Sequence, residues 1–301
     1  MALLIQSSNF VVTKPMLEDL NPYAAACLRA IIPACLVPLL FLIKKPMKVG
    51  TIKNKYLLIL CAFGNFIWFP LLSTYGLSLT TASKASLIFS FSPIVTIILC
   101  HFFLSDKLNF RRVIGIILST IGVIAIINPS YDSMSQGSWI GDLLVLIATV
   151  GSGISYIASA QLVKSLNSYS VICFSVLMGG IILSIFFLYG RMWSYLGSAD
   201  LKIWLSLFYI GVFGVLISNG LIIYAVKYVS AVTLSSTYFV TPFISIILSI
   251  LFLKEHISII SIFAGLLILI GVYFTKYKRN EGLSKIFFKG GDIHESKTSN
   301  S

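Results

Sequence analysis

The sequence has few charged residues and very few acids. Asp, Glu, Lys and Arg make up 11% of its 301 residues, whereas hydrophobic residues make up 57%. Soluble domains carry about 25% charged residues, so this composition excludes an ordinary soluble domain and favours a polytopic membrane protein. The apolar runs are continuous rather than alternating, which predicts transmembrane helices and argues against a β-barrel.

The sequence also lacks the patterns that typify disulfide frameworks, metal sites and enzymes. Its five cysteines all lie in apolar segments without a Cys-x-x-Cys pair, which indicates small buried hydrophobic residues. It contains no His-Glu-x-x-His, no Gly-x-Ser-x-Gly and no phosphate-binding glycine loop. We therefore expect no enzyme activity, no catalytic residue, no metal and no cofactor.

Acids are missing from the middle of the apolar runs. All ten fall in expected loops, span boundaries or the tail: Glu18, Asp19, Asp106, Asp132, Asp142, Asp200, Glu255, Glu281, Asp292 and Glu295. Proton-driven carriers commonly use an Asp or Glu inside the membrane as a relay. The distribution therefore favours facilitated diffusion or exchange, if the protein is a carrier.

Ten membrane-spanning helices are expected from the apolar runs. They lie at residues 2–17, 24–43, 56–79, 83–104, 112–128, 139–163, 169–189, 203–226, 231–253 and 257–275. The first range holds several polar residues and lacks the features of a signal peptide. Either it is a short helix, or the start codon used here lies downstream of the true one.

Basic residues are distributed unevenly between the two sides of these spans. Sixteen of the 22 Lys and Arg residues fall on one side and five on the other. The positive-inside rule then places both termini in the cytoplasm. Because the cations lie mainly in loops and the tail, insertion topology and anionic lipid account for the net charge of +12, and no nucleic-acid partner is expected.

One segment occurs twice. Residues 82–106 and 231–255 share eight identities at an offset of 149 positions: Ala82/Ala231, Ser86/Ser235, Pro93/Pro242, Ile97/Ile246, Ile98/Ile247, Leu99/Leu248, Phe103/Phe252 and Leu104/Leu253. Each copy carries a mid-span proline, which removes a backbone donor and predicts a helix kink. Gly122-Val123 recurs as Gly271-Val272 at the same offset.

The repetition predicts two five-helix repeats, at residues 1–130 and 131–276, followed by a polar cytoplasmic tail at 277–301. An odd number of spans gives the two repeats opposite orientations in the membrane. Inverted repeats are typical of transporters whose substrate site lies near the membrane midplane. The fold class expected is therefore an all-α polytopic membrane protein of ten helices in two inverted repeats.

The sequence resembles the ten-span EamA-type permeases of the drug/metabolite transporter superfamily. The matching features are Ser8-Asn9-Phe10-Val11, Leu28-Arg29, Ala82…Pro93…Leu104-Ser105-Asp106-Lys107-Leu108, Gly141-Asp142 and Pro242…Phe252-Leu253-Lys254-Glu255. It departs from that pattern at Gln6-Ser7, where the family usually has Trp-Gly, and at Asp106, where it usually has Glu.

This resemblance implies a central cavity between the repeats and export or exchange of small metabolites such as amino acids. It also implies a location in a bacterial inner membrane. Two alternatives stay open: a proton-coupled efflux carrier for drugs or other metabolites, and a membrane scaffold that transports nothing.

Polar and aromatic side chains inside the spans are candidates for substrate contacts, because such groups in a membrane usually face a cavity or another helix. The candidates are Asn9, Thr13, Asn65, Trp68, Tyr75, Lys84, Ser86, Ser155, Tyr156, Asn219, Tyr224, Ser235 and Tyr238. For any single serine, a hydrogen bond within its own helix or to a neighbouring helix is the favoured interpretation.

Two cations inside spans have competing interpretations. Lys84 could be the counter-charge for a substrate carboxylate, but a lysine extending its amine to the interface is favoured. Arg29 is expected to pair with Glu18 or Asp19. We also hypothesise that kinks at Pro93 and Pro242 gate the two sides of the membrane.

Small residues predict close helix packing in the fifth and tenth spans. They form the pattern Gly115-x-x-x-Ser119-x-x-Gly122, and Gly265 and Gly271 follow in the last span. Packing within one chain is the favoured interpretation, and a homodimer contact is the alternative.

The expected partners of the protein are a small-molecule substrate and membrane lipid. If the small residues form a homodimer contact instead, a second copy of the chain is also a partner.

Overall fold

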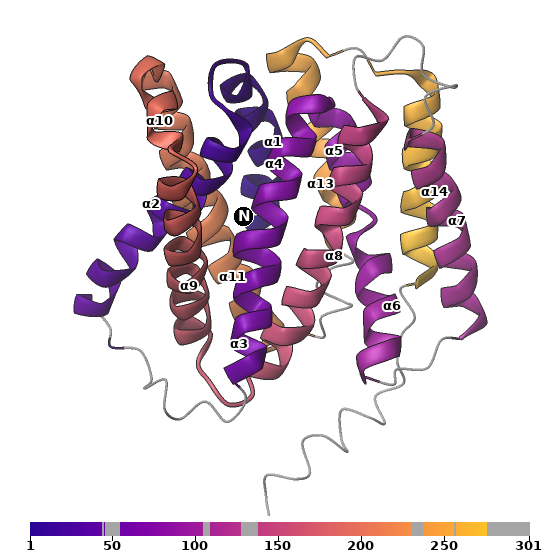
Figure 1. The fold of residues 1–301 in the computed structure, drawn as a ribbon. Coiled ribbons are helices and arrows are strands. Elements are labelled where there is room, and N and C mark those ends of the chain that lie inside the picture. Colours follow the sequence, from indigo (N-terminus) through magenta and orange to yellow (C-terminus); the bar gives the residue numbers. More distant parts are fainter. Residues whose placement is uncertain are drawn as a thin grey trace, which may run out of the picture.

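The protein is a bundle of helices in the computed structural model, which describes residues 1–43, 45, 55–104, 109–127, 138–229, 237–255 and 257–275 (Figure 1). Within these ranges the chain forms no β-strand. The continuous apolar runs therefore form helices, which satisfy their own backbone hydrogen bonds as a membrane requires.

The first half of the chain begins with two single helices and continues with two interrupted ones. Its elements are α1 (Ala2–Asp19), α2 (Pro22–Ile43), α3 (Lys55–Ala62), the π-helix η2 (Phe63–Trp68), α4 (Phe69–Leu79), α5 (Ala82–Phe89), α6 (Ser92–Leu104) and α7 (Phe110–Ile127). Elements α3, η2 and α4 follow one another directly as one rod.

The second half of the chain has a corresponding order of elements. They are α8 (Trp139–Leu162), α9 (Ser168–Tyr189), the 3₁₀ helix η4 (Met192–Ser198), α10 (Leu201–Phe208), the π-helix η5 (Tyr209–Ile217), α11 (Ser218–Val226), the 3₁₀ helix η6 (Thr237–Val240), α13 (Thr241–Leu248), the π-helix η7 (Ser249–Leu253) and α14 (Ile259–Thr275). The π-helices η2 and η5 interrupt corresponding rods of the two halves.

Within the part of the chain that the structure describes, seven helical segments are long and apolar enough to cross a membrane. They are α2, α3–α4, α5–α6, α7, α8, α9 and α10–α11, and α13–η7 and α14 are shorter apolar helices. The multi-pass membrane character is therefore confirmed, whereas ten spans in two inverted repeats stay a prediction.

The two prolines of the repeated segment occupy equivalent places. The helix is interrupted at Ser90 and Phe91, and Pro93 is the second residue of α6. Pro242 is likewise the second residue of α13, directly after η6. A proline is tolerated in the first turn of a helix because the N–H it lacks has no intrahelical acceptor there.

Helices α7 and α14 lie side by side at one edge of the bundle, joined through small residues (Figure 1). A Cβ atom on Gly115 would lie 2.5 Å from the carbonyl oxygen of Gly271, and one on Gly122 would lie 2.7 Å from that of Ala264. The hydroxyl of Ser119 donates to the carbonyl of Ile268 at 3.1 Å. The glycine pattern thus mediates packing between two helices of the same chain, which was the favoured interpretation.

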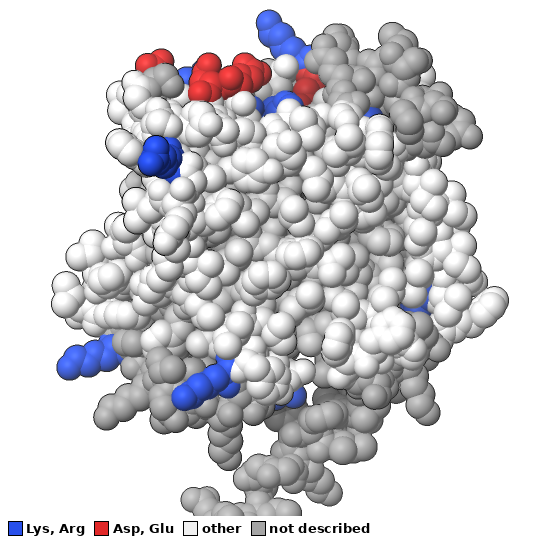
Figure 2. Space-filling model, in the orientation of Figure 1, with Lys and Arg blue, Asp and Glu red and all other residues white. Residues whose placement is uncertain are grey.

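Charged side chains gather at the two ends of the bundle, and Figure 2 shows a broad band between them with almost none. The described acids lie at the end where α1 finishes and α5, α8 and α10 begin, which we call the acidic end: Glu18, Asp19, Asp142, Asp200 and Glu255. The opposite, basic end carries Lys45, Lys55, Arg111, Arg112, Lys164 and Lys227.

Candidate functional site

A small polar cavity lies inside the bundle between α1, α2 and α4. Its polar lining comes from Gln6, Asn9, Thr13, Arg29 and Ser73. Its apolar walls come from Phe10, Phe69 and Leu77. Convergent polar groups on apolar walls are typical of sites that bind small molecules. Two predicted site residues, Asn9 and Thr13, are therefore in the cavity.

Arg29 is the only charged residue among the described residues that line this cavity. Its side chain is buried, with 8% exposed, and Nη1 donates to the Thr74 hydroxyl at 3.1 Å. Its Nε has no hydrogen-bond partner. Among the described residues no ion pair joins Arg29 to an acid, so the expected pairing with Glu18 or Asp19 is wrong.

The amide of Asn9 is held between α1 and the π-helix η5. Its Nδ2 donates to Oε1 of Gln6 at 3.4 Å, and that oxygen also accepts from the Ser218 hydroxyl at 3.2 Å. Oδ1 of Asn9 is buried without a partner, and a Cβ on Gly214 would overlap it. The absence of a side chain at Gly214 therefore makes room for this amide.

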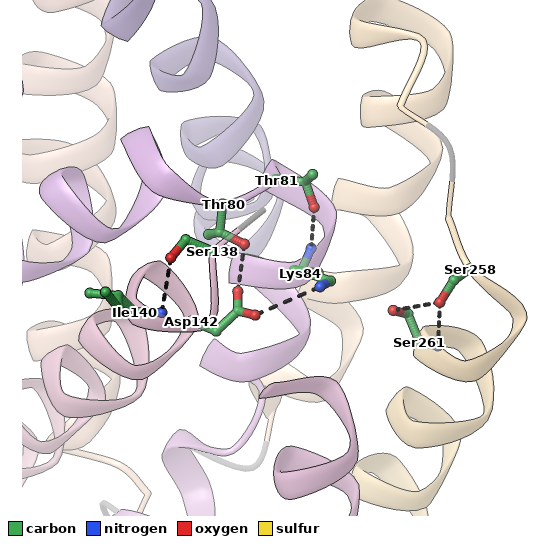
Figure 3. Close-up of polar contacts among 8 residues, drawn as sticks. All are labelled: Thr80, Thr81, Lys84, Ser138, Ile140, Asp142, Ser258 and Ser261. Carbon is green, nitrogen blue, oxygen red and sulfur yellow. Dashed lines mark hydrogen bonds and ion pairs between the residues drawn. The ribbon is translucent and has the colours of Figure 1, made fainter. Parts of the chain in front are cut away.

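Lys84 lies outside the cavity, at the acidic end, in a buried ion pair (Figure 3). Its Nζ is 3.7 Å from Oδ2 of Asp142, and the two residues are 5% and 1% exposed. Oδ1 of Asp142 accepts from the Thr80 hydroxyl at 2.5 Å. The favoured interpretation, a lysine extending to the interface, is therefore wrong.

The turn between α4 and α5 is held by two more charged side chains. Nζ of Lys14, on α1, donates to the carbonyls of Leu77 at 3.0 Å and Thr80 at 2.6 Å. Glu255, which follows η7, accepts from the N–H groups of Ala82 at 2.8 Å and Ser83 at 3.0 Å. These contacts match the partial charges at helix ends and fasten the turn to both halves of the chain.

An aromatic cluster lies next to the cavity, where α5 is interrupted. Phe89 contacts Phe10, Phe69 and Tyr238, with ring centroids 5.9, 5.3 and 5.5 Å away. Tyr156 of α8 lies 5.9 Å from Tyr238. Since Phe10 and Phe69 also line the cavity, the predicted residues Tyr156 and Tyr238 stand behind its apolar wall.

Four other predicted residues make hydrogen bonds that join or stabilise helices. Nδ2 of Asn65 donates to Oδ1 of Asn219 at 2.8 Å, linking η2 to α11. Ser155 donates to the carbonyl of Cys61 at 3.1 Å, and Ser86 to that of Ser83 at 2.8 Å. The two amides thus bind each other, and both serines make hydrogen bonds of the kind that was favoured for single serines.

The remaining predicted residues are not among the described residues that line the cavity. Trp68 donates from its indole to the Ile147 carbonyl at 3.0 Å, and Tyr75 stacks on Tyr23 with centroids 4.9 Å apart. Tyr224 is 54% exposed, and its hydroxyl is 3.0 Å from that of Tyr228. Ser235 lies outside the described residues.

Sequence reasoning missed Gln6 and Ser73 as cavity residues, and Ser73 has a buried hydroxyl without a partner. Both are polar residues within an expected span, so the signal that selected Asn9 could have selected them too.

Comparison with known proteins identifies the family. The model of the EamA-like transporter family matches residues 1–128 and 139–277. The chain belongs to this family. It is therefore a multi-pass membrane transporter and not an enzyme.

Relatives and a solved structure agree with this membership. An uncharacterized transporter of Bacillus subtilis, YdfC, is 27% identical, and the match covers 93% of this chain and 90% of that protein. A WAT1-related chloroplastic protein of Arabidopsis thaliana is 25% identical over 89% of this chain and 66% of its own. One crystal structure, 15% identical, has a TM-score of 0.64 and covers 91% of this chain and 94% of its own, so it has the same fold.

Proposed function

We propose that this EamA-family transporter is a secondary carrier that exports or exchanges small metabolites such as amino acids. The observation that carries the proposal is the buried cavity lined by Asn9, Thr13 and Arg29. Polar groups that converge inside an apolar bundle, with several hydrogen-bonding atoms unpartnered, suit a small polar solute.

Transport by alternating access is the mechanism that suits this arrangement. The cavity is lined by the first half of the chain, but Asn9 packs against Gly214 of the second half. Relative motion of the two halves would therefore change the cavity directly. The interruptions before Pro93 and Pro242 provide places where the helices could bend.

The family resemblance implies a location in a bacterial inner membrane, and the charge distribution supports an orientation with the basic end in the cytoplasm. At the acidic end, the turn between α4 and α5 is held by hydrogen bonds to Lys14 and Glu255 and by the ion pair of Lys84 with Asp142. In this orientation the fastened end is the outer one, so substrate would reach the cavity from the cytoplasm.

Counterflow in proteoliposomes tests the proposal. Vesicles loaded with unlabelled amino acids and given a labelled pool, without a proton or sodium gradient, should accumulate label above protein-free vesicles. Absence of accumulation by folded protein would reject amino acids as the substrate class.

Proton coupling is the second candidate, because Asp142 is a nearly buried acid next to Lys84. If flux requires an imposed proton gradient and the Asp142→Asn variant loses that requirement, the protein is a proton-coupled carrier.

A further inference from the structure

We propose that Arg29 binds the carboxylate of the transported solute, so that the carrier takes small organic anions and zwitterions and rejects analogues that lack the carboxylate. The inference rests on the proposed function and deepens it. The sequence offered Lys84 for this role only as the less favoured interpretation, whereas the geometry points to Arg29.

Among the residues that the structure describes, no acid forms an ion pair with Arg29. The guanidinium remains protonated in proteins, so it cannot avoid its burial by losing a proton. An unpaired buried charge is costly, and intramembrane cations usually pair with an acid or line a functional pathway. Thr74 satisfies one donor of Arg29 with a neutral hydroxyl, which leaves the charge uncompensated.

Among the described residues Lys84, unlike Arg29, has an acidic partner. Its ammonium is 3.7 Å from the carboxylate of Asp142, which neutralises it within the protein. The surroundings of the two cations thus differ: Lys84 joins helices at the acidic end, and Arg29 lines a cavity whose described lining residues include no acid.

The donors of Arg29 match a planar oxyanion. A guanidinium presents parallel N–H groups that bind a carboxylate or phosphate through two hydrogen bonds. Arg29 lines the cavity, and its buried Nε is one such donor without a partner. The apolar walls formed by Phe10, Phe69 and Leu77 suit a solute with a short hydrocarbon part, which favours an organic carboxylate over inorganic phosphate.

Two unpartnered atoms accompany the guanidinium. Oδ1 of Asn9 and the hydroxyl of Ser73 are both buried, and both residues belong to the lining of the same cavity. An amide oxygen accepts hydrogen bonds, so Asn9 is suited to an ammonium or hydroxyl group on the same solute. A site with a cation and a separate acceptor would bind an amino acid. It would reject the corresponding amide because the amide lacks the negative charge.

Ligand-induced thermal shifts of the purified full-length protein test this assignment. The probes are pooled amino acids, the corresponding pooled amino-acid amides and inorganic phosphate. We expect the amino acids to raise the Tm of the wild type by several degrees and the amides to leave it unchanged. Arg29→Gln should abolish the shift, Arg29→Lys should retain part of it, and the exposed control Arg191→Gln should keep all of it.

The ligand-free Tm separates a binding role from a structural one. If Arg29 serves the substrate, Arg29→Gln removes an uncompensated buried charge, so the Tm should stay equal or rise. A fall in Tm would indicate a structural role and contradict the assignment. Equal shifts in wild type and Arg29→Gln, or no shift with any probe, would also overturn it.

The remaining outcomes separate this inference from the proposed function. A shift with phosphate alone would reject the carboxylate. Counterflow of amino acids and amides at equal rates would reject the role of Arg29 and leave the carrier function in place. An Arg29-dependent shift without any counterflow, with or without an imposed proton gradient, would reject the carrier function and leave the binding site in place.

Discussion

At the scale of single residues, the buried pair of Lys84 and Asp142 has a large predicted effect on stability. Asp142→Asn leaves the ammonium buried without its counter-charge, which costs about 3–5 kcal/mol. We expect a matching loss in the free energy of unfolding, measured by denaturation in detergent.

A second substitution provides the control for this effect. In the double variant Lys84→Met/Asp142→Asn the unpaired charge is gone, so most of the lost stability should return. If the double variant is as unstable as the single one, the loss comes from packing around Asp142 and not from the charge.

Gly214 gives a prediction about transport rather than stability. A Cβ there would overlap Oδ1 of Asn9, so Gly214→Ala should displace the amide from the cavity. We expect at least a tenfold loss of counterflow with a change in Tm of only a few degrees. The matched control is Gly220→Ala, because the nearest atom to its new Cβ would be 3.9 Å away. Equal transport by both variants would show that the position of Asn9 does not matter.

The sequence was informative about which residues are polar within the spans, but not about their partners. Asn9 and Thr13 were predicted for the cavity and line it. The roles of Arg29 and Lys84 were misjudged because their surroundings depend on contacts between segments far apart in the chain. Tyr224 was expected to contact substrate but is exposed on the surface of the bundle. The helix face that points inward depends on the rotation of the rod α10–η5–α11, which contains a π-helix.

At the scale of elements, the interrupted helices give a prediction about rate. Pro93→Ala and Pro242→Ala restore a backbone donor next to each interruption and should favour continuous, stiffer helices. We expect each variant to slow counterflow severalfold at an unchanged amount of folded protein. Unchanged rates in both variants would exclude a gating role for these prolines.

The contact between α7 and α14 is predicted to resist enlargement of its glycines. In Gly122→Ala the new methyl group would lie 2.7 Å from the backbone oxygen of Ala264, which cannot yield as a side chain would. Overpacking of this kind costs about 1–3 kcal/mol. The Tm in detergent should fall clearly, whereas Ile121→Ala on the exposed side of α7 should change it little.

At the scale of the whole molecule, the charge distribution predicts the orientation in the membrane. A variant without its native cysteines would receive a single cysteine at Ser194, near the acidic end, or at Ser165, near the basic end. A membrane-impermeant maleimide should label Ser194→Cys in intact cells and Ser165→Cys only after permeabilisation. The reverse pattern would invert the proposed orientation.

The all-helical character and the approximate bounds of the described helices were predictable because helix bounds follow from the lengths of the apolar runs. The breaks within these runs could be predicted only in part. Pro93 indicated the interruption at Ser90 and Phe91, but no residue pattern indicated the π-helices η2 and η5. A π-helix depends on how neighbouring helices pack, and the sequence does not show this directly.

The contact between α7 and α14 also has an evolutionary reading. Gly115 meets Gly271 while Gly122 meets Ala264, and the offset of 149 makes Ala264 and Gly271 the counterparts of Gly115 and Gly122. Such an exchange of partners defines an isologous interface between identical subunits. A forerunner with half this length could have assembled as an antiparallel pair through the same glycines. Fusion of its two copies then freed each half to diverge, and Arg29 is present in one half only.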